Sequence, residues 1–210
     1  MSYQLVVAFA ALAAYLVGSV SFAIVVSRCR GIADPRSYGS GNPGATNVLR
    51  SGDRVAAALT LLGDAAKGFF AVMVVRWIAA DALPLEWRSA AVSAAAFGVF
   101  LGHLFPLYHR FQGGKGVATA FGVLLALDTR IAALVALTWL IVAGVSRTSS
   151  LAALCAAVAA PPLTLWLDGL GVMFWSVSGI SVLLVFRHRK NIRLLLQGEE
   201  KSFSKRNADR

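Results

Sequence analysis

Two glycine-rich segments combine small polar side chains with a cation, a pattern that suits the binding of a phosphate. The first, residues 39–50, reads GSGNPGATNVLR and ends at Arg50, while the second, residues 113–119, reads GGKGVAT and carries Lys115. Glycine leaves backbone N–H groups accessible, and successive N–H groups form anion-binding concavities. The second segment lacks the Walker A spacing. Each segment alone could equally be an ordinary turn or a glycine-permitted close approach of two helices.

A third segment, residues 187–200, brings an imidazole and an amide together. His188 and Asn191 are three residues apart and would share one face of a helix, where they could act beside an acyl or phosphate group. The shorter segment 147–150, RTSS, contributes Ser150. Most of the cations in residues 187–200 could instead be a simple positive-inside anchor.

The motifs that the chain lacks narrow the chemistry further. No G-x-S-x-G elbow is present, which argues against an acyl-serine triad, and no histidine is followed five residues later by aspartate. The three histidines lack zinc-ligand spacing, and no carboxylate cluster suggests Mg²⁺. We therefore predict no metal and no cofactor, with phosphate held by Arg, Lys and backbone amides.

The composition predicts an integral membrane protein. Of the 210 residues, 58% are hydrophobic and 14% charged, with a mean hydropathy of +0.69, against about 45–50% and 25% in soluble domains. The net charge of +10 is explained by the collection of basic residues on the cytoplasmic side. A nucleic-acid partner is excluded because aromatic residues do not interleave with the basic clusters.

Apolar segments predict an all-α, polytopic transmembrane bundle of about seven helices, or five plus a re-entrant hairpin if residues 117–127 and 131–146 form one. Arg28 follows the first segment and places the N-terminus outside, and because both counts are odd the C-terminus lies in the cytoplasm, with the basic residues mostly inside. We expect one transmembrane domain over residues 1–196 and a polar, basic tail over 197–210 that is drawn to anionic lipids. The predicted segments are 1–27, 55–75, 89–107, 117–127, 131–146, 151–167 and 171–186.

Three ionisable residues fall within these apolar segments. Asp64 and Lys67 are three residues apart on one helical face, and charges at membrane depth usually face the protein interior. His103 is expected to be an interior histidine with its hydrogen bonds satisfied, although it could also contribute to the site.

The chain as a whole resembles the bacterial membrane acyltransferases that use acyl phosphate to acylate glycerol 3-phosphate. By the odd number of spans, the glycine-rich segments and His188 all fall on the cytoplasmic side, although they are distant in sequence. Leu194 occupies a position where the family usually has arginine. The resemblance rests on residues 39–50, on Asp64 with Lys67 and Gly68, on residues 103–119, and on residues 187–200.

The resemblance implies transfer of a fatty acyl group from acyl phosphate to the 1-hydroxyl of glycerol 3-phosphate. The products would be lysophosphatidic acid and phosphate, in the first acylation step of phospholipid biosynthesis in the bacterial inner membrane. An acyl phosphate is a mixed anhydride with a good leaving group, so positioning and charge stabilisation can suffice. Expected partners are membrane lipids and, transiently, the soluble enzyme that makes acyl phosphate.

The resemblance implies two groups of site residues, one catalytic and one substrate-binding. It leaves two alternatives for the group that accepts the proton. Either His188 or the phosphate of the donor could take the proton of the attacking hydroxyl. A phosphate transporter, a CDP-alcohol phosphotransferase and a non-catalytic scaffold are the competing functions; the first two would need an inverted repeat or an aspartate-rich metal motif. The catalytic group is Ser40, Lys115, His188 and Asn191; the substrate-binding group is Gly41, Asn42, Thr46, Asn47, Arg50, Gly113, Gly114 and Ser150.

Overall fold

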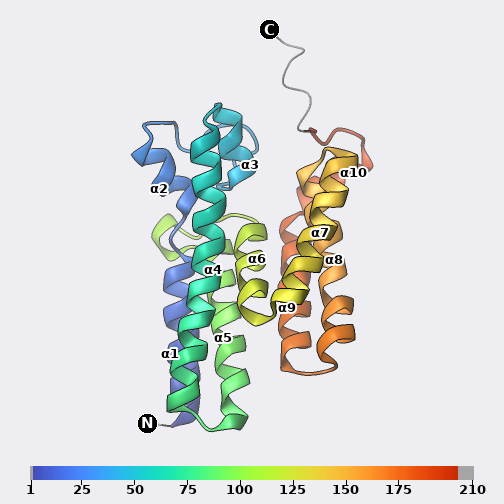
Figure 1. Ribbon diagram of the computed structural model, residues 1–210. Coiled ribbons are helices and arrows are strands. Elements are labelled where there is room, and N and C mark those ends of the chain that lie inside the picture. The colour runs from blue at the N-terminus through green and yellow to red at the C-terminus, as the bar shows by residue number, and fades with distance from the viewer. Residues whose placement is uncertain (1, 203–210) are drawn as a thin grey trace. The chain divides into compact units, whose positions relative to one another are not determined.

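The structure, a computed structural model, describes residues 2–202, and helices are the only regular secondary structure in that range (Figure 1). The predicted all-α class is therefore confirmed, while residues 203–210 of the predicted tail lie outside the described part. The helices are α1 (Tyr3–Gly18), α2 (Phe22–Cys29), α3 (Ala45–Val48), α4 (Arg54–Ala82), α5 (Leu85–Leu104), α6 (Val117–Leu127), α7 (Thr129–Ser146), α8 (Ser149–Asp168), α9 (Val172–Arg187) and α10 (Arg189–Leu196), with short 3-10 helices η1 (Leu49–Ser51) and η2 (Leu107–His109).

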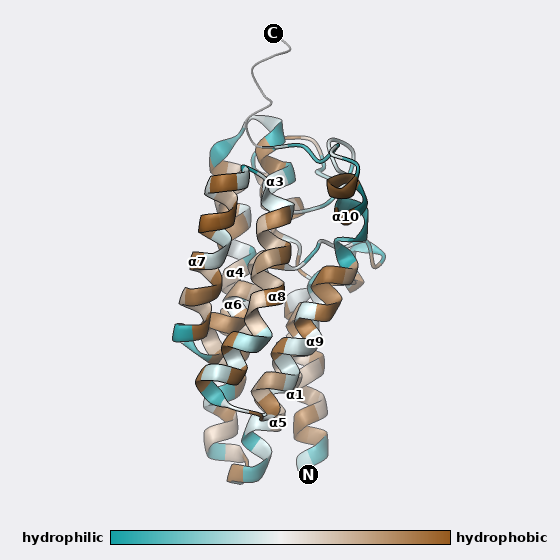
Figure 2. Ribbon diagram, turned by 90° about the vertical axis from the view of Figure 1, so that its right-hand side faces the viewer, coloured by the Kyte–Doolittle hydropathy of each residue, from teal (hydrophilic) through white to brown (hydrophobic). Residues whose placement is uncertain are grey.

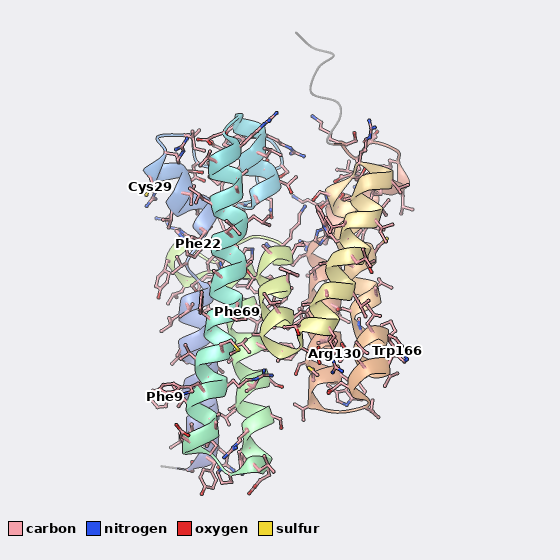
Figure 3. The ribbon with its side chains drawn as sticks, viewed as in Figure 1. Phe9, Phe22, Cys29, Phe69, Arg130 and Trp166 are labelled. Atoms are coloured by element: carbon pink, nitrogen blue, oxygen red, sulfur yellow. The ribbon has the colours of Figure 1, made fainter. Side chains whose placement is uncertain are left out.

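Several of these helices have the length and apolar composition that a bilayer requires. Within residues 2–202, five stretches can cross a membrane, and α6 and α9 are shorter apolar helices. Large apolar side chains also point outward, as lipid-facing residues do: Phe9 is 62% exposed and Trp166 is 75% exposed (Figure 3). The five stretches are Tyr3–Cys29, Arg54–Ala82, Leu85–His109, Thr129–Ser146 and Ser149–Asp168.

The chain divides into two compact units, an N-terminal unit of residues 1–127 and a C-terminal unit of residues 128–210. In the N-terminal unit, α1 packs along α5, and α4 packs along both α5 and α6 (Figure 1). In the C-terminal unit, α8 packs against α7 and α9, and α10 follows α9. Each unit is described separately below.

Glycines allow the helices of the N-terminal unit to approach closely. A Cβ atom on Gly98 would collide with the backbone of Ala11, which explains the tight pairing of α1 with α5. A Cβ atom on Gly122 would collide with the backbone of Ala65 in the same way, between α6 and α4. Small residues serve this purpose in membrane proteins, where packing rather than water exclusion drives helix association.

The first apolar segment, predicted to span the membrane, has the length and composition for a span over Tyr3–Cys29, but it consists of two helices. The helix ends at Gly18 and resumes at Phe22. The Nζ atom of Lys67 donates a hydrogen bond to the Val20 carbonyl at 2.7 Å, and Ser19 Oγ accepts one from the Leu107 N–H at 3.2 Å. Side chain and backbone from distant parts of the chain therefore satisfy polar groups at the break, as an irregular backbone within a membrane segment requires.

Aspartates fix where two long helices begin. Asp53 caps α4, because its Oδ1 accepts a hydrogen bond from the Ala56 N–H at 2.9 Å. Asp128 caps α7 by accepting from the Arg130 N–H at 2.7 Å. The side chain of Arg130 also hydrogen-bonds Asp128 and lowers the pKa of its carboxyl to about 2. The carboxylate is thus ionised, the form that favours a helix N-terminus.

Hydropathy distinguishes the long helices from α10 (Figure 2). The long helices are mostly apolar, whereas α10 carries both polar and apolar residues over its short length. This distribution is typical of an amphipathic helix. The basic residues of 187–193 lie at the end of α9 and in α10, and a polar segment follows α10 up to Ser202, the last described residue.

Candidate functional site

Asn47 organises the first glycine-rich segment from the inside. Its side chain is 2% exposed. Its Oδ1 accepts hydrogen bonds from the Ser40 N–H at 2.9 Å and from Arg50 Nη1 at 3.4 Å, while its Nδ2 donates to the carbonyls of Pro35 at 2.6 Å and Tyr38 at 3.1 Å. The amide is thus committed to the segment itself, which makes Asn47 a positioning residue in this geometry.

Gly39 lets the Arg50 side chain cross the segment. Gly39 has a φ of 61°, and a Cβ atom there would collide with Asn47 Oδ1 and lie 3.1 Å from Arg50 Cδ. Only glycine combines this left-handed backbone with so close a neighbour. The guanidinium of Arg50 is therefore held beside the loop backbone. The predicted residues that remain exposed or half-buried here are Ser40, Gly41, Asn42, Thr46 and Arg50.

The two glycine-rich segments meet at Gly114. Its N–H donates a hydrogen bond to the His103 carbonyl at 3.1 Å. A Cβ atom on Gly114 would collide with the His103 ring and lie 3.1 Å from the Pro43 carbonyl oxygen of the first segment. Gly114 is buried and Lys115, the next residue, is half-buried. The structure thus brings Gly113, Gly114 and Lys115 to the segment that carries Ser40 and Arg50.

A buried polar cluster lies behind this junction. Lys67 Nζ is 2.8 Å from Asp64 Oδ1, His103 Nδ1 is 3.6 Å from the same oxygen, and Thr119 Oγ1 is 3.1 Å from His103 Nδ1. All four residues are at most 7% exposed. The prediction that Asp64 and Lys67 face the interior is confirmed, and His103 is a buried histidine with polar partners. The cluster ties α4, α5 and α6 together beneath Gly114.

In the C-terminal unit, Glu200 joins two of the predicted residues. Its Oε1 accepts hydrogen bonds from Ser150 Oγ and from Asn191 Nδ2, each at 2.6 Å. Glu200 was not among the predicted site residues. Its signal in the sequence was a carboxylate at the end of a basic segment, but nothing in that pattern pointed to Ser150, which lies fifty residues away.

His188 lies at the junction of α9 and α10 with its side chain buried, at 2% exposure. Its Nδ1 lies 2.8 Å from the Leu184 carbonyl oxygen. A carbonyl can only accept, so Nδ1 carries a proton and the lone pair of the neutral ring is on Nε2. His188 directly follows the last residue of α9, and Asn191 belongs to the first turn of α10. The Ile192 N–H donates to the His188 carbonyl at 2.9 Å and so begins that helix.

The cysteines and other metal-binding side chains form no cluster in the part of the chain that is described. Within residues 2–202, no group of three or more His, Cys, Asp or Glu side chains could hold a metal ion. Cys29 and Cys155 are both free thiols.

Comparison with known proteins identifies the family of the chain. The sequence profile of the glycerol-3-phosphate acyltransferase family matches residues 8–198, nearly the whole chain. The chain belongs to this family. It is an acyltransferase embedded in the membrane, and a place in phospholipid biosynthesis follows from the family.

Relatives and solved structures of glycerol-3-phosphate acyltransferases agree with this assignment. The Burkholderia lata enzyme is 58% identical over 193 residues, covering 91% of this chain and 88% of the relative. The Cupriavidus necator enzyme is 56% identical over 191 residues, covering 90% and 93%. The crystal structure of PlsY, an integral membrane glycerol 3-phosphate acyltransferase, in its glycerol 3-phosphate form has a TM-score of 0.84 and 33% identity, covering 94% of this chain and 95% of that one.

Proposed function

We propose that this acyltransferase takes its acyl group from acyl phosphate and transfers it to the 1-hydroxyl of glycerol 3-phosphate. The products are 1-acyl-glycerol 3-phosphate, a lysophosphatidic acid, and inorganic phosphate. The observation that carries the proposal is the meeting of the two cation-bearing glycine-rich segments at Pro43 and Gly114. Both substrates carry a phosphate, and each segment carries a cation, Arg50 or Lys115, that can pair with one.

The reaction needs no covalent intermediate on the enzyme. The 1-hydroxyl oxygen attacks the acyl carbonyl carbon, a C–O bond forms, and the bond between that carbon and the phosphate oxygen breaks. Phosphate leaves with its electron pair, and the hydroxyl proton goes either to the donor phosphate or to Nε2 of His188. Positioning of the reactants and stabilisation of developing charge supply the rate enhancement.

The positions of the side chains support the following proposed roles. Arg50 and Lys115 hold phosphate groups, and Asn47 keeps the first segment in shape by its four hydrogen bonds. Ser150 and Asn191 contact the substrates, and Glu200 orients both side chains by accepting a hydrogen bond from each. The groups that orient substrate or line the anion sites are Ser40, Gly41, Asn42, Thr46, Gly113 and Gly114.

We place the enzyme in the bacterial inner membrane with these segments facing the cytoplasm. The basic residues of 28–54, 110–115 and 187–201 support this orientation. A cytoplasmic site would receive glycerol 3-phosphate directly from solution and acyl phosphate from the soluble enzyme that makes it. The lipid product would then enter the inner leaflet.

The test of the donor is an assay of the purified enzyme in lipid with labelled glycerol 3-phosphate. Acyl phosphate, acyl-CoA and acyl carrier protein are supplied separately at the same acyl chain length. Labelled lysophosphatidic acid is expected with acyl phosphate alone. Equal or greater turnover with either thioester would refute the proposed donor while leaving the acyltransferase assignment intact.

The test of the phosphate sites compares matched cation variants. Arg50→Ala and Lys115→Ala should each lower kcat/KM on the order of 100-fold, the effect of losing charge-assisted hydrogen bonds of about 3 kcal/mol. Arg54→Ala and Lys190→Ala remove the same charges from exposed positions outside the proposed site and should leave kcat/KM near that of the parent. Normal turnover in Arg50→Ala and Lys115→Ala would contradict the assignment.

The proton acceptor is tested with His188→Ala. If His188 is the base, the acidic limb of the pH–rate profile disappears in this variant. If the variant is slower but keeps the parent's pH dependence, the donor phosphate is the acceptor.

A further inference from the structure

The N-terminal unit contains a second cationic feature that the proposed reaction does not use. It is an open pocket of about 370 Å³, which we call the arginine pocket. It is formed by the end of α2, by the residues that lead into the first glycine-rich segment, and by the residues that follow α5. Its lining residues are Arg28, Arg36, Tyr108, His109, Arg110 and Gln112.

The charge in the arginine pocket is only partly balanced. Arg36 pairs with Asp34, with Nη2 2.7 Å from Oδ2 and Nε 3.0 Å from Oδ1. Hydrogen bonding from Arg36 holds the pKa of the Asp34 carboxyl below its usual range, so the carboxylate is ionised at neutral pH. Across residues 2–202, no carboxylate lies within ion-pair distance of Arg28 or Arg110. Three guanidinium groups thus share one carboxylate, and this excess favours an anion.

Arginine also matches one kind of anion in particular. Its planar guanidinium donates paired hydrogen bonds to phosphate or carboxylate oxygens. The pairing with Asp34 holds the guanidinium of Arg36 in place. The phenol of Tyr108 and the amide of Gln112 add neutral donors at the same pocket. The lining therefore offers several donors, from Arg28, Arg110, Tyr108 and Gln112, for a group with three or four acceptor oxygens.

The backbone at the edge of the pocket is strained. Arg110 and Phe111 have φ values of 53° and 60°, consecutive left-handed conformations that residues other than glycine rarely adopt. Hydrogen bonds from the Phe111 N–H to the Pro106 carbonyl at 2.9 Å and from the Gln112 N–H to the His109 carbonyl at 3.0 Å hold this turn. The turn places Arg110 in the lining of the pocket, and strain of this kind is retained mainly where it serves a function.

The same turn exposes a group of apolar side chains beside the pocket. Aromatic and aliphatic residues next to cations are typical of the bilayer interface, where rings lie at the depth of the lipid headgroups. Basic pockets at that depth bind anionic headgroups. The exposed fractions are 38% for Phe105, 47% for Leu107, 55% for Tyr108 and 56% for Phe111.

We propose that the arginine pocket binds a phosphate group outside the acyl-transfer site. Both a membrane phospholipid with an anionic headgroup and a soluble phosphate have this chemistry, and the exposed apolar rim favours the lipid. The bound group would neutralise Arg28 and Arg110 and so anchor the turn that precedes Gly113. No bond is made or broken in the pocket, so the proposal stands apart from the proposed acyl donor.

The experiment measures lipid binding to the purified full chain by native mass spectrometry. The probes are phosphatidylglycerol, phosphatidylcholine as the zwitterionic comparison, and inorganic phosphate as a soluble competitor. The pocket variant is Arg28→Gln with Arg110→Gln. The control is Arg54→Gln with Lys190→Gln, which removes the same charge from exposed positions that do not line the pocket.

The parent and the control are expected to retain one phosphatidylglycerol more tightly than phosphatidylcholine. The pocket variant should lose that retention by about 30-fold, as expected for two arginines near a lipid surface. If inorganic phosphate displaces the lipid from the parent but not from the pocket variant, soluble phosphate also enters the pocket. Equal retention of both lipids, with no effect of phosphate, in all three proteins would overturn the proposal.

Two checks separate loss of a site from loss of the fold. The single variants Arg28→Gln and Arg110→Gln should each show an intermediate loss of retention. The pocket variant should keep the parent's unfolding temperature in detergent without added lipid, because neither arginine loses an ion-pair partner within residues 2–202. If the double variant fails to fold, the two single variants decide, and parental lipid retention in both would refute the proposal.

Discussion

At the scale of single residues, the site depends on side chains that hold other side chains. Glu200 is the clearest case in the C-terminal unit, because one of its carboxylate oxygens accepts both from Ser150 and from Asn191. Hydrogen bonds to a charged acceptor contribute more than neutral ones, and leaving the donors unsatisfied has its own cost. The orientation of Ser150 and Asn191, two predicted site residues of this unit, therefore depends on Glu200, which has no step of its own in the proposed reaction.

Glu200→Ala should destabilise the C-terminal unit by about 2 kcal/mol, since two charge-assisted hydrogen bonds are lost at a half-buried position. Glu200→Gln retains an oxygen that can accept from both donors and should recover part of the loss. Thermal unfolding of the purified protein, read together with kcat/KM, measures both effects. Glu199→Ala is the matched control, because Glu199 is adjacent and exposed. If the Glu199 and Glu200 variants were equally stable, the role of Glu200 would be wrong.

Asn47 has the corresponding position in the N-terminal unit. Asn47→Ala removes the acceptor of the Ser40 N–H and the donor to Pro35 and Tyr38. At about 1 kcal/mol for each hydrogen bond, local opening of this segment should become easier by about 3 kcal/mol. Amide hydrogen exchange over residues 35–50 should accelerate accordingly. Asn42→Ala, in the same segment, should leave the exchange rates unchanged, and parental rates in Asn47→Ala would contradict the positioning role.

These two residues show what the sequence could reveal about the site. The glycine-rich segments and residues 187–200 could be recognised as candidate site segments, because the residue types and spacing that indicate phosphate binding lie close together in the sequence. Asn47 was predicted as a substrate contact. Its burial with four hydrogen bonds could not be predicted, because the partners Pro35, Tyr38 and Ser40 lie in an irregular loop whose conformation no periodic pattern indicates. Glu200 lies in the 187–200 segment on which the resemblance rests, but it was not predicted as a site residue, since its partner Ser150 is remote in sequence.

At the scale of helices, close packing depends on a few glycines. Gly122 in α6 faces the backbone of Ala65 in α4, and Gly68 in α4 faces the backbone of Thr119 in α6. These reciprocal contacts place α4 and α6 closer than larger residues would permit. Thr119 also contacts His103, so the spacing of this helix pair determines the geometry behind Gly114.

Gly122→Ala should destabilise the N-terminal unit by about 1–3 kcal/mol, the usual cost of overpacking a tight contact, because its methyl group would collide with backbone rather than a mobile side chain. Activity should also fall, since α6 begins two residues after Lys115. Gly144→Ala in α7 is the control: no atom of the described chain lies within 4 Å of the place its methyl group would take, so stability should stay the same or rise by up to about 1 kcal/mol. Both are measured by thermal unfolding in one detergent. A Gly122 variant as stable as the Gly144 variant would refute the close contact.

The helices also show where periodicity and composition reach their limit. The bounds of α6 were predicted to the residue, because Gly116 and Asp128 interrupt the apolar run on both sides. The second segment was predicted to end at residue 75, yet α4 continues to Ala82. Arginine is a good helix former, so the charge of Arg76 ends the apolar segment but not the helix, and its guanidinium donates to the Leu127 carbonyl at 3.0 Å. The break after Gly18 likewise depends on Lys67, a partner that local sequence does not indicate.

At the scale of the whole molecule, charge distribution predicts the orientation in the membrane. Cations are frequent in the connections at residues 28–54, 110–115 and 187–201, and sparse in those near residues 76–88 and 128–130. In the N-terminal unit, the turn between α4 and α5 lies at the same end as the N-terminus, and α2 and α3 lie at the opposite end (Figure 1). The positive-inside rule therefore assigns the α2–α3 end to the cytoplasm.

Cysteine labelling tests this orientation in intact cells. In a background of Cys29→Ser and Cys155→Ala, an impermeant maleimide should label Asp81→Cys from outside, because Asp81 is exposed beside the outer turn. Ser51→Cys is exposed at the opposite end of the same unit and should be labelled only after the membrane is permeabilised. Lys201→Cys provides the same test for the end of the described chain and should behave like Ser51→Cys. External labelling of Ser51→Cys would invert the topology, place the glycine-rich segments away from the cytoplasmic substrates, and refute the proposed localisation even if purified enzyme were active.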